Sequence, residues 1–188
     1  MDDIVKAALL KWPNVPHCRG WLGLDARGQW YMRDDRTQAL GRFDSGLPQA
    51  RGSLLRHEKL VEFIQRNYQV ESRGDDQGQW YFQNGPQRVY VELEATPFIW
   101  RLEPDFCVRA HTGQDATCRQ AWLDETGCLY LETDLGFGLV HTADMVRAAD
   151  AVEAGLWTPQ PVLKAELPGQ FGFVCSPAAA QAAPRHPD

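Results

Sequence analysis

Hydrophobic and polar residues alternate in short runs along most of the chain, and one pattern occurs three times. The three copies read LDARGQWY at 24–31, GDDQGQWY at 74–81 and LDETGCLY at 123–130. In each, Asp stands three positions before Gly, the pattern of a type I turn that ends in a residue of positive φ. Alternation resumes after the glycine with Trp or Leu and then Tyr. We therefore expect three β-hairpins, each with the Trp or Leu in the core and the Tyr on the opposite face of its strand.

A second repeat predicts two helices. The segments LLRHEKLV (54–61) and LVHTADMV (139–146) can be aligned with each other. In each, an extended stretch leads to a capping residue and then to apolar residues at helical spacing. His57 and Thr142 occupy the same position in this alignment, so each is expected to begin a helix. Asp144 would suit the positive end of the second helix dipole.

The remaining sequence predicts further strands and few helices. Residues 87–94 alternate as a half-buried strand, residues 98–102 return as another, and short strands are expected near 106–113, 118–125, 161–167 and 171–175. Residues 33–52 form a polar loop in this interpretation. The fold class is therefore α+β, with a mainly antiparallel sheet built from repeated hairpin units and two short helices. The predicted segments are an N-terminal segment (1–16), a first hairpin-helix unit (17–70), a central hairpin and strand unit (71–118), a third hairpin-helix unit with terminal strands (119–175) and a loose tail (176–188).

Composition and charge restrict the class of protein. The chain has 188 residues, 44% of them hydrophobic, and a formal net charge of -6. A general nucleic-acid binder needs a basic face, so nucleic acid is not an expected partner. The acidic N-terminus does not resemble a secretory signal, and no apolar run approaches the length of a membrane span. Five cysteines without a Cys-x-x-Cys pair favour a reducing cytoplasm. No membrane partner is expected, and with no Gly-x-Gly-x-x-Gly or Walker loop in the sequence no cofactor is expected either.

Three longer stretches resemble a proteobacterial family of uncharacterised proteins, filed as a domain of unknown function. They are KWPNVPHCRGWLGLDARGQWY, LLRHEKLVEFIQRNY and QGQWYFQNGPQRVYVELEATPF, which cover most of residues 11–103, and AWLDETGCLYLE extends the likeness. A more distant group shows a similar hairpin and a strand that ends in Ala-Pro-Phe. That group implies a repeated α+β architecture with an antiparallel sheet and a suggested role in signalling. The resemblance implies no catalytic residue.

The stretch FQNGPQRVYVELE offers the best candidate binding residues. Asn84 lies at a predicted turn, Arg88 and Tyr90 follow on one strand, and Arg101 lies on the next. Arginine suits carboxylate or phosphate because its planar guanidinium donates two parallel hydrogen bonds. We therefore expect a groove for a small anionic ligand or a partner peptide. The alternative is a solvated sheet face on which Arg88 pairs with Glu92, and Arg101 with Glu103, in weak surface ion pairs.

Metal and aromatic-cage alternatives have weaker patterns. Zinc ligands usually occur in pairs two to four residues apart, and among Cys107, His111 and Cys118 only the first two are spaced in this way. His17 and Cys18 would have to complete such a site. The acidic residues of the second hairpin lack the spacing of a calcium loop. Choline-binding hairpins repeat about every 20 residues without intervening helices, so the Trp-Tyr pairs are interpreted as core and no metal is expected.

Three classes of function are compatible with the sequence. The favoured one is a non-enzymatic binding or regulatory module of the cytoplasm. A second is a small hydrolase or transferase whose site is assembled from scattered residues such as His57, Cys107 and His111. A third is a structural subunit of an oligomer, which predicts a large exposed apolar patch. The oligomeric state is left open.

Overall fold

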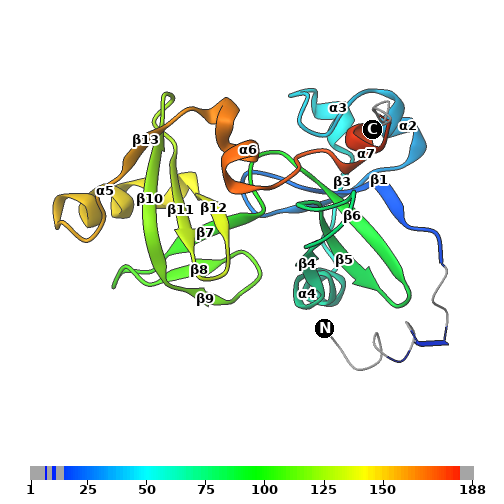
Figure 1. Ribbon diagram of the computed structural model, residues 1–188, viewed down its shortest axis with the longest axis horizontal. Helices are drawn as coiled ribbons and strands as arrows, with labels where there is room; N and C mark the ends of the chain where they lie inside the picture. The colour runs from blue at the N-terminus through cyan, green and yellow to red at the C-terminus, as the bar shows by residue number, and fades with distance from the viewer. Residues whose placement is uncertain (1–6, 8–9, 12–14, 183–188) are drawn as a thin grey trace. The chain divides into compact units, whose positions relative to one another are not determined.

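The chain folds into two compact units in the computed structural model, which describes residues 7, 10–11 and 15–182 (Figure 1). The first unit comprises the described residues of 1–25, 29–94 and 174–188, so its sequence is discontinuous. The second comprises residues 26–28 and 95–173. The chain passes from the first unit to the second at residue 95, inside the segment 71–118 that the sequence predicted as a central unit.

The first unit contains a six-stranded mixed sheet. Its strand order is β3-β2-β1-β6-β5-β4, and β1 pairs in parallel with β6 whereas the other neighbours are antiparallel. The core includes Trp30, Ile64, Tyr90 and Leu93, all of them almost fully buried. The strands are β1 (Cys18–Leu24), β2 (Trp30–Met32), β3 (Ser53–Leu54), β4 (Tyr68–Val70), β5 (Trp80–Asn84) and β6 (Gln87–Leu93).

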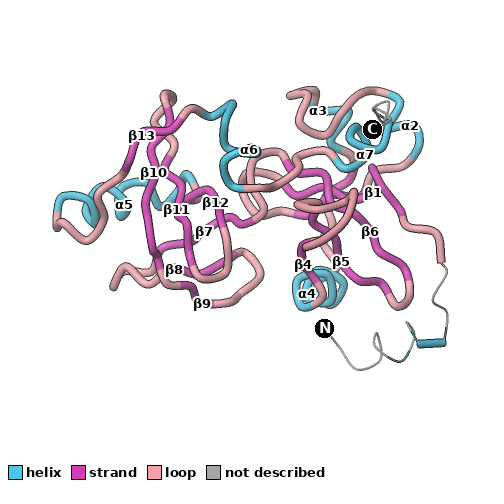
Figure 2. Tube along the Cα trace, in the orientation of Figure 1, coloured by secondary structure: helices cyan, strands magenta, loops and turns pink. Residues whose placement is uncertain are grey.

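Short helices accompany this sheet, as Figure 2 shows in cyan. They are α2 (Asp35–Ala39), α3 (Pro48–Arg51), α4 (Glu58–Arg66) and α7 (Pro177–Ala182). The helix predicted after His57 is confirmed as α4, and the His57 side chain caps it by accepting a hydrogen bond from the Leu60 N–H at 3.3 Å. Helices α2 and α3 lie where the sequence indicated a polar loop, and α7 lies in the segment expected to be a loose tail.

The second unit contains a seven-stranded mixed sheet. Its order is β13-β10-β11-β12-β7-β8-β9, with parallel pairing of β10 with β13 and of β12 with β7. Its strands are β7 (Phe98–Leu102), β8 (Val108–Ala110), β9 (Asp115–Ala116), β10 (Cys118–Asp124), β11 (Leu129–Thr133), β12 (Phe137–Val140) and β13 (Gln160–Val162). Its helices are the 3-10 turns η1 (Thr142–Asp144) and η2 (Lys164–Glu166), with α5 (Met145–Glu153) and α6 (Leu167–Phe171).

The three repeated turns form hairpins as predicted. Gly28, Gly78 and Gly127 have φ values of 78°, 81° and 82°, in the region that favours glycine. They connect β1 with β2, β4 with β5, and β10 with β11. The Trp or Leu that follows each glycine is buried, which confirms the core assignment. Tyr81 and Tyr130 are buried as well, so the second face of these strands is also covered.

Two predictions about the architecture are wrong. The sheets are mixed rather than mainly antiparallel, because β6 and β12 each return beside an earlier strand and run parallel to it. Six α-helices lie in the described part of the chain instead of two. The broad α+β class is correct.

Local details also differ near residues 142 and 171. The η1 turn is capped by His141, which accepts a hydrogen bond from the Ala143 N–H at 3.0 Å, so Thr142 is not the cap. The strand expected at 171–175 is absent from the described residues, because Phe171 ends helix α6 and Gly172 follows it in the left-handed region.

Candidate functional site

The β7–β8 hairpin places two arginines directly opposite each other. Arg101 on β7 pairs with Arg109 on β8 in the antiparallel register. Residues on either side of both arginines are buried, so the two guanidinium groups leave the sheet on its solvent-exposed face. Like charges at directly opposite positions destabilise a sheet, so each cation needs an acidic neighbour or a bound anion.

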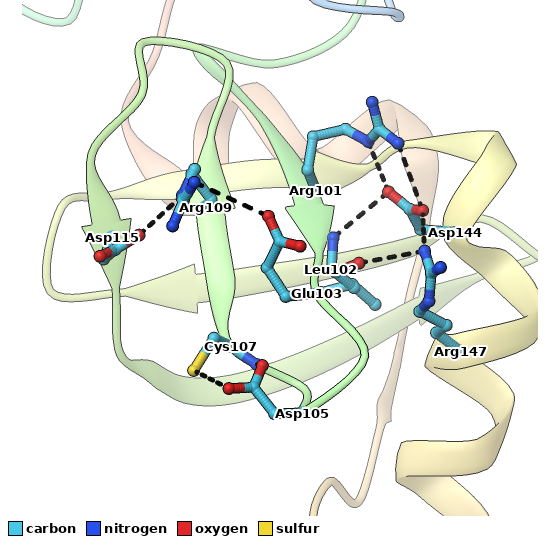
Figure 3. Close-up of polar contacts among 9 residues, drawn as sticks. All are labelled: Arg101, Leu102, Glu103, Asp105, Cys107, Arg109, Asp115, Asp144 and Arg147. Atoms are coloured by element: carbon cyan, nitrogen blue, oxygen red, sulfur yellow. Dashed lines mark hydrogen bonds and ion pairs between the residues drawn. The ribbon is translucent and has the colours of Figure 1, made fainter.

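Asp144 supplies the acidic partner of Arg101 and of a third arginine. One oxygen of its carboxylate lies 2.5 Å from Arg101 Nε and accepts the Leu102 N–H at 3.2 Å. The other accepts Arg147 Nη1 at 2.9 Å (Figure 3). The Asp144 side chain is only 1% exposed, whereas those of Arg101 and Arg147 are 51% and 44% exposed. A fixed carboxylate therefore holds two partly solvated guanidinium groups in place.

The ionisation of Asp144 follows from these contacts. Burial alone would raise its pKa, but the hydrogen bonds from Arg101 and the Leu102 N–H outweigh burial and hold the pKa below the ordinary value. Asp144 is therefore a carboxylate at neutral pH. Asp144 is the N-cap residue of helix α5, at the positive end of the helix dipole. Its side chain makes no capping hydrogen bond and instead pairs with the arginines.

Arg109 has weaker and more exposed partners. Its Nε lies 2.9 Å from Asp115, and its Nη1 lies 3.8 Å from Glu103. Figure 3 shows this group beside the cluster formed by Arg101, Asp144 and Arg147. The partner side chains of Arg109 are 73% exposed at Asp115 and 44% exposed at Glu103, so water competes for these contacts.

These arginines surround a hollow of about 510 Å³, called the arginine pocket here. The second unit carries six Lys and Arg residues against eleven Asp and Glu residues, and four of the six cations line this one pocket. Positive charge is therefore concentrated on an otherwise acidic unit. The lining residues are Arg27, Gly28, Ile99, Arg101, Leu102, Glu103, Arg109, Ala110, His111, Gly113 and Arg147.

His111 contributes a neutral wall to the pocket. Its Nδ1 accepts a hydrogen bond from the Ile99 N–H at 3.3 Å. The loss of water around the ring lowers the pKa of His111 to about 3, so the imidazole is uncharged at neutral pH. Such a low pKa does not suit a general acid or base that operates near pH 7.

The other residues of the scattered-site hypothesis lie in unfavourable settings. The Cys107 thiol donates a hydrogen bond to Asp105 at 3.3 Å, and this carboxylate raises the pKa of the thiol. A raised pKa reduces the thiolate fraction, which is the nucleophilic form. His57 belongs to the first unit, where it caps α4.

The four predicted ligand-binding residues do not share one unit. Arg101 lines the arginine pocket, whereas Asn84, Arg88 and Tyr90 lie on β5 and β6 of the first unit. Asn84 is exposed at the end of β5.

Arg88 and Tyr90 belong to a cluster of ion pairs and rings in the first unit. Arg88 forms an ion pair with Glu71, and its guanidinium carbon lies 4.9 Å from the centre of the Tyr81 ring. The Tyr90 hydroxyl donates to Asp76 at 3.2 Å. These contacts position the side chains against their neighbours, and the expected role of Asn84, Arg88 and Tyr90 in binding stays a prediction.

The predicted surface ion pairs have other partners. Arg88 pairs with Glu71 rather than Glu92, and Arg101 pairs with Asp144 rather than Glu103. Glu92 is buried because its strand is central in the sheet, and it accepts hydrogen bonds from the Ser176 hydroxyl and the Ala178 N–H.

Sequence reasoning missed Arg109 and Arg147 as site residues. Arg109 could have been found by pairing the two predicted strands, since the register places it opposite Arg101. Arg147 lies on α5, far along the chain, and no spacing rule connects it with β7.

Residues 7, 10–11 and 15–182 contain neither a cluster of metal ligands nor a membrane-spanning helix. No three His, Cys, Asp or Glu side chains in these residues are close enough together to hold a metal ion, so the zinc alternative gains no support. No helix in this part of the chain has the length and apolar character to cross a membrane.

Comparisons with known proteins give one family and one structural neighbour. A family model described as "Protein of unknown function (DUF2946)" matches residues 1–178. A solved structure of a DUF1285 family protein from Silicibacter pomeroyi DSS-3 is similar, with 13% sequence identity and a TM-score of 0.47, and the match covers 80% of this chain and 84% of that one. Among curated proteins no significant match is found.

Proposed function

Since the chain belongs to the family described as "Protein of unknown function (DUF2946)", whose description names no activity, we propose from the arginine pocket that the protein binds a small, multiply charged oxyanion. The observation that carries this proposal is the cross-strand pair of Arg101 and Arg109. Arg101 shares its partner Asp144 with Arg147, and the partners of Arg109 are solvated, so an anion between the two cations would add to the compensation of their repulsion.

The chemistry of the pocket suits carboxylate or phosphate groups. Each guanidinium has five N–H donors, and Asp144 uses only part of those of Arg101 and Arg147. Their remaining donors, with those of Arg109, are partly exposed to solvent. Arginine donates to planar or tetrahedral oxyanions in pairs of parallel hydrogen bonds. The volume of about 510 Å³ lies within the usual range for small-molecule sites.

Arg109 is the residue best placed to exchange partners when a ligand binds. Its contacts with Asp115 and Glu103 are solvated, so their loss costs little free energy. Asp144, by contrast, is buried and fixed by three donors, and it keeps Arg101 and Arg147 in position. Of the four arginines that line the pocket, Arg101 and Arg147 are thus held by Asp144, whereas Arg109 has solvated partners that an anion can replace.

A binding role is favoured over a hydrolase or transferase. The neutral His111 and the raised pKa of the Cys107 thiol supply neither a suitable general base nor an activated nucleophile. A regulatory role for the bound state and a location in the cytoplasm stay predictions of the sequence.

Isothermal titration calorimetry with pyrophosphate and with citrate tests the proposal. We expect saturable binding of at least one anion to the purified protein, and an affinity that falls as salt concentration rises. Arg109→Gln should weaken binding at least tenfold. Arg119→Gln is the matched control, because Arg119 is an exposed arginine of the same unit that does not line the pocket.

Two results would contradict the proposal. If neither pyrophosphate nor citrate binds at low salt, the arginine pocket does not bind the proposed class of oxyanion. Equal weakening by Arg109→Gln and Arg119→Gln would show a general charge effect rather than a site.

A further inference from the structure

The second unit also has an apolar hollow of about 270 Å³. It is lined by side chains of β10, β11, α5 and the segment before β13, among them Leu123, Leu129, Met145, Val152 and Pro159. This volume is below the usual range for small-molecule sites. The hollow is suited instead to one or two apolar side chains of a partner.

A second hollow adjoins the first and extends it. Its volume is about 480 Å³, and it shares Leu123 and Pro159 with the smaller one. Pro161, Val162 and Leu163 provide most of the rest of its apolar wall. The two hollows together are called the apolar groove.

Exposed hydrophobic side chains gather around this groove. Leu123, Val152 and Leu163 line the groove and are exposed, and Val146 and Leu156 are exposed large hydrophobic residues of the same unit outside its lining. They belong to β10, to α5 and the turn after it, and to the residue that follows β13. Scattered exposed leucines are ordinary, but a group of them beside two apolar hollows is typical of a binding surface.

The charged side chains that line the groove are acidic, although Lys164 lies close by and its backbone N–H donates to Glu125 at 2.9 Å. Glu153 lines the smaller hollow, and Glu125 and Glu166 line the larger one, all three exposed. No Lys, Arg or His lines either hollow. Four of the six cations of this unit line the arginine pocket instead. A partner for the groove should therefore carry positive charge beside its apolar residues.

The adjacent sheet edge limits the shape of that partner. Strand β13 is an edge strand of three residues, and Pro161 at its centre has no N–H to donate. A partner strand cannot form a regular ladder on such an edge. Helix docking into a groove needs no backbone hydrogen bonds from the sheet.

We propose that the apolar groove docks a cationic amphipathic helix from a partner protein. Its apolar side chains enter the two hollows, and its Lys or Arg side chains lie beside Glu125, Glu153 and Glu166. This inference is independent of anion binding, because it uses other residues of the second unit.

Fluorescence anisotropy with a defined peptide tests the inference. The probe is a labelled helical peptide of about 18 residues, with Leu at i, i+3, i+4 and i+7 and Lys at the remaining positions. We expect saturable binding by the full chain. The same Leu pattern with Glu in place of Lys should bind at least tenfold more weakly, and a scrambled peptide of the original composition should also lose affinity.

Variants of the groove provide the second part of the test. Leu123→Thr should weaken binding of the Lys peptide at least fivefold. Val152→Thr should weaken binding in the same direction, and it replaces Leu123→Thr as the test if that variant folds poorly. The matched control is Leu47→Thr, a leucine of the first unit that is 51% exposed against 42% for Leu123. Glu153→Gln combined with Glu166→Gln should weaken binding and flatten its dependence on salt.

Several outcomes would overturn the inference. Equal binding of the Lys, Glu and scrambled peptides would show nonspecific adhesion, and no effect of either groove variant would place binding elsewhere. Sedimentation could instead reveal a dimer of the chain that Leu123→Thr dissociates. In that case a second copy covers the groove, and the proposed partner helix is wrong.

Discussion

Asp144 is the residue on which the geometry of the arginine pocket depends, and its replacement gives the sharpest test of the structure. Asp144→Asn preserves the shape of the side chain but removes its charge. The ion pairs with Arg101 and Arg147 are then lost, and because both arginines are about half exposed each pair is worth under about 1 kcal/mol. We expect Asp144→Asn to lower the free energy of unfolding by about 1–2 kcal/mol.

Asp144→Ala should cost more than Asp144→Asn. Alanine cannot accept the Leu102 N–H, and an unsatisfied buried donor costs about 1–3 kcal/mol. Asparagine can still accept that hydrogen bond through its carbonyl oxygen. The difference between the two variants therefore measures the backbone contact, and the asparagine variant alone measures the charge. Urea denaturation followed by tryptophan fluorescence gives both values.

The charge contribution of Asp144 depends on pH with a defined sign. Its pKa is below the ordinary value in the folded protein, so its stabilising effect is present at neutral pH and is lost as pH falls through the folded pKa. The stability difference between wild type and Asp144→Asn should be largest at pH 7 and should shrink toward pH 3. Asp150→Asn, an exposed carboxylate on the same helix, is the control. An equal difference at both pH values would refute the reasoning.

Further predictions concern backbone strain and a buried acid. Gly28→Ala should destabilise the protein more than Gly127→Ala, by about 1 kcal/mol or more, because both have positive φ but only the first would place a Cβ 2.8 Å from the Cβ of His111. Thermal unfolding of the two variants decides this, and equal losses would contradict it. Burial raises the pKa of Glu92 even though Ser176 donates to it, so its contribution to stability should increase as pH falls from 7 to 5. Glu92→Gln should abolish that increase in urea denaturation, and an unchanged pH dependence would count against it.

Local turn chemistry made part of the fold predictable from sequence. The first and third Asp-x-x-Gly hairpins depend on contacts within a few residues. Asp25 accepts the Gln29 N–H at 2.8 Å, and Asp124 accepts the Cys128 N–H at 2.9 Å. Such hydrogen bonds join residues that are only a few positions apart in the sequence, so the spacing of Asp and Gly is enough to predict them. The resemblance to a family of unknown function is likewise confirmed.

Strand order was not predictable by the same means. The parallel pairing of β1 with β6 joins Leu22 with Val91, residues separated by the whole of β2 to β5. Nothing in the local alternation of either strand specifies a parallel neighbour, because alternation reports burial of faces and not direction. The parallel pairings of the mixed sheets therefore depend on how all strands of a unit pack together, which the local sequence pattern does not specify.

Only part of the candidate site was predictable from the sequence, because local patterns do not report long-range contacts. Arg101 was identified because arginine on a strand beside polar residues suits an anion. Its partner Asp144 was assigned to the helix dipole, a local explanation, whereas it binds side chains of β7. Long-range pairing of this kind depends on how α5 packs in the second unit, which sequence spacing does not encode.

The discontinuity of the first unit has a consequence for synthesis on the ribosome. Cys175 O accepts the Leu93 N–H at 2.7 Å, and Glu92 accepts the Ala178 N–H at the start of α7. These partners are translated about 80 residues after β6, whereas the second unit is almost contiguous. The nascent chain can therefore complete the second unit before the first. Until residues 174–182 emerge, Glu92 lacks the donors that stabilise its buried carboxylate, so the first unit closes only after these residues have been translated.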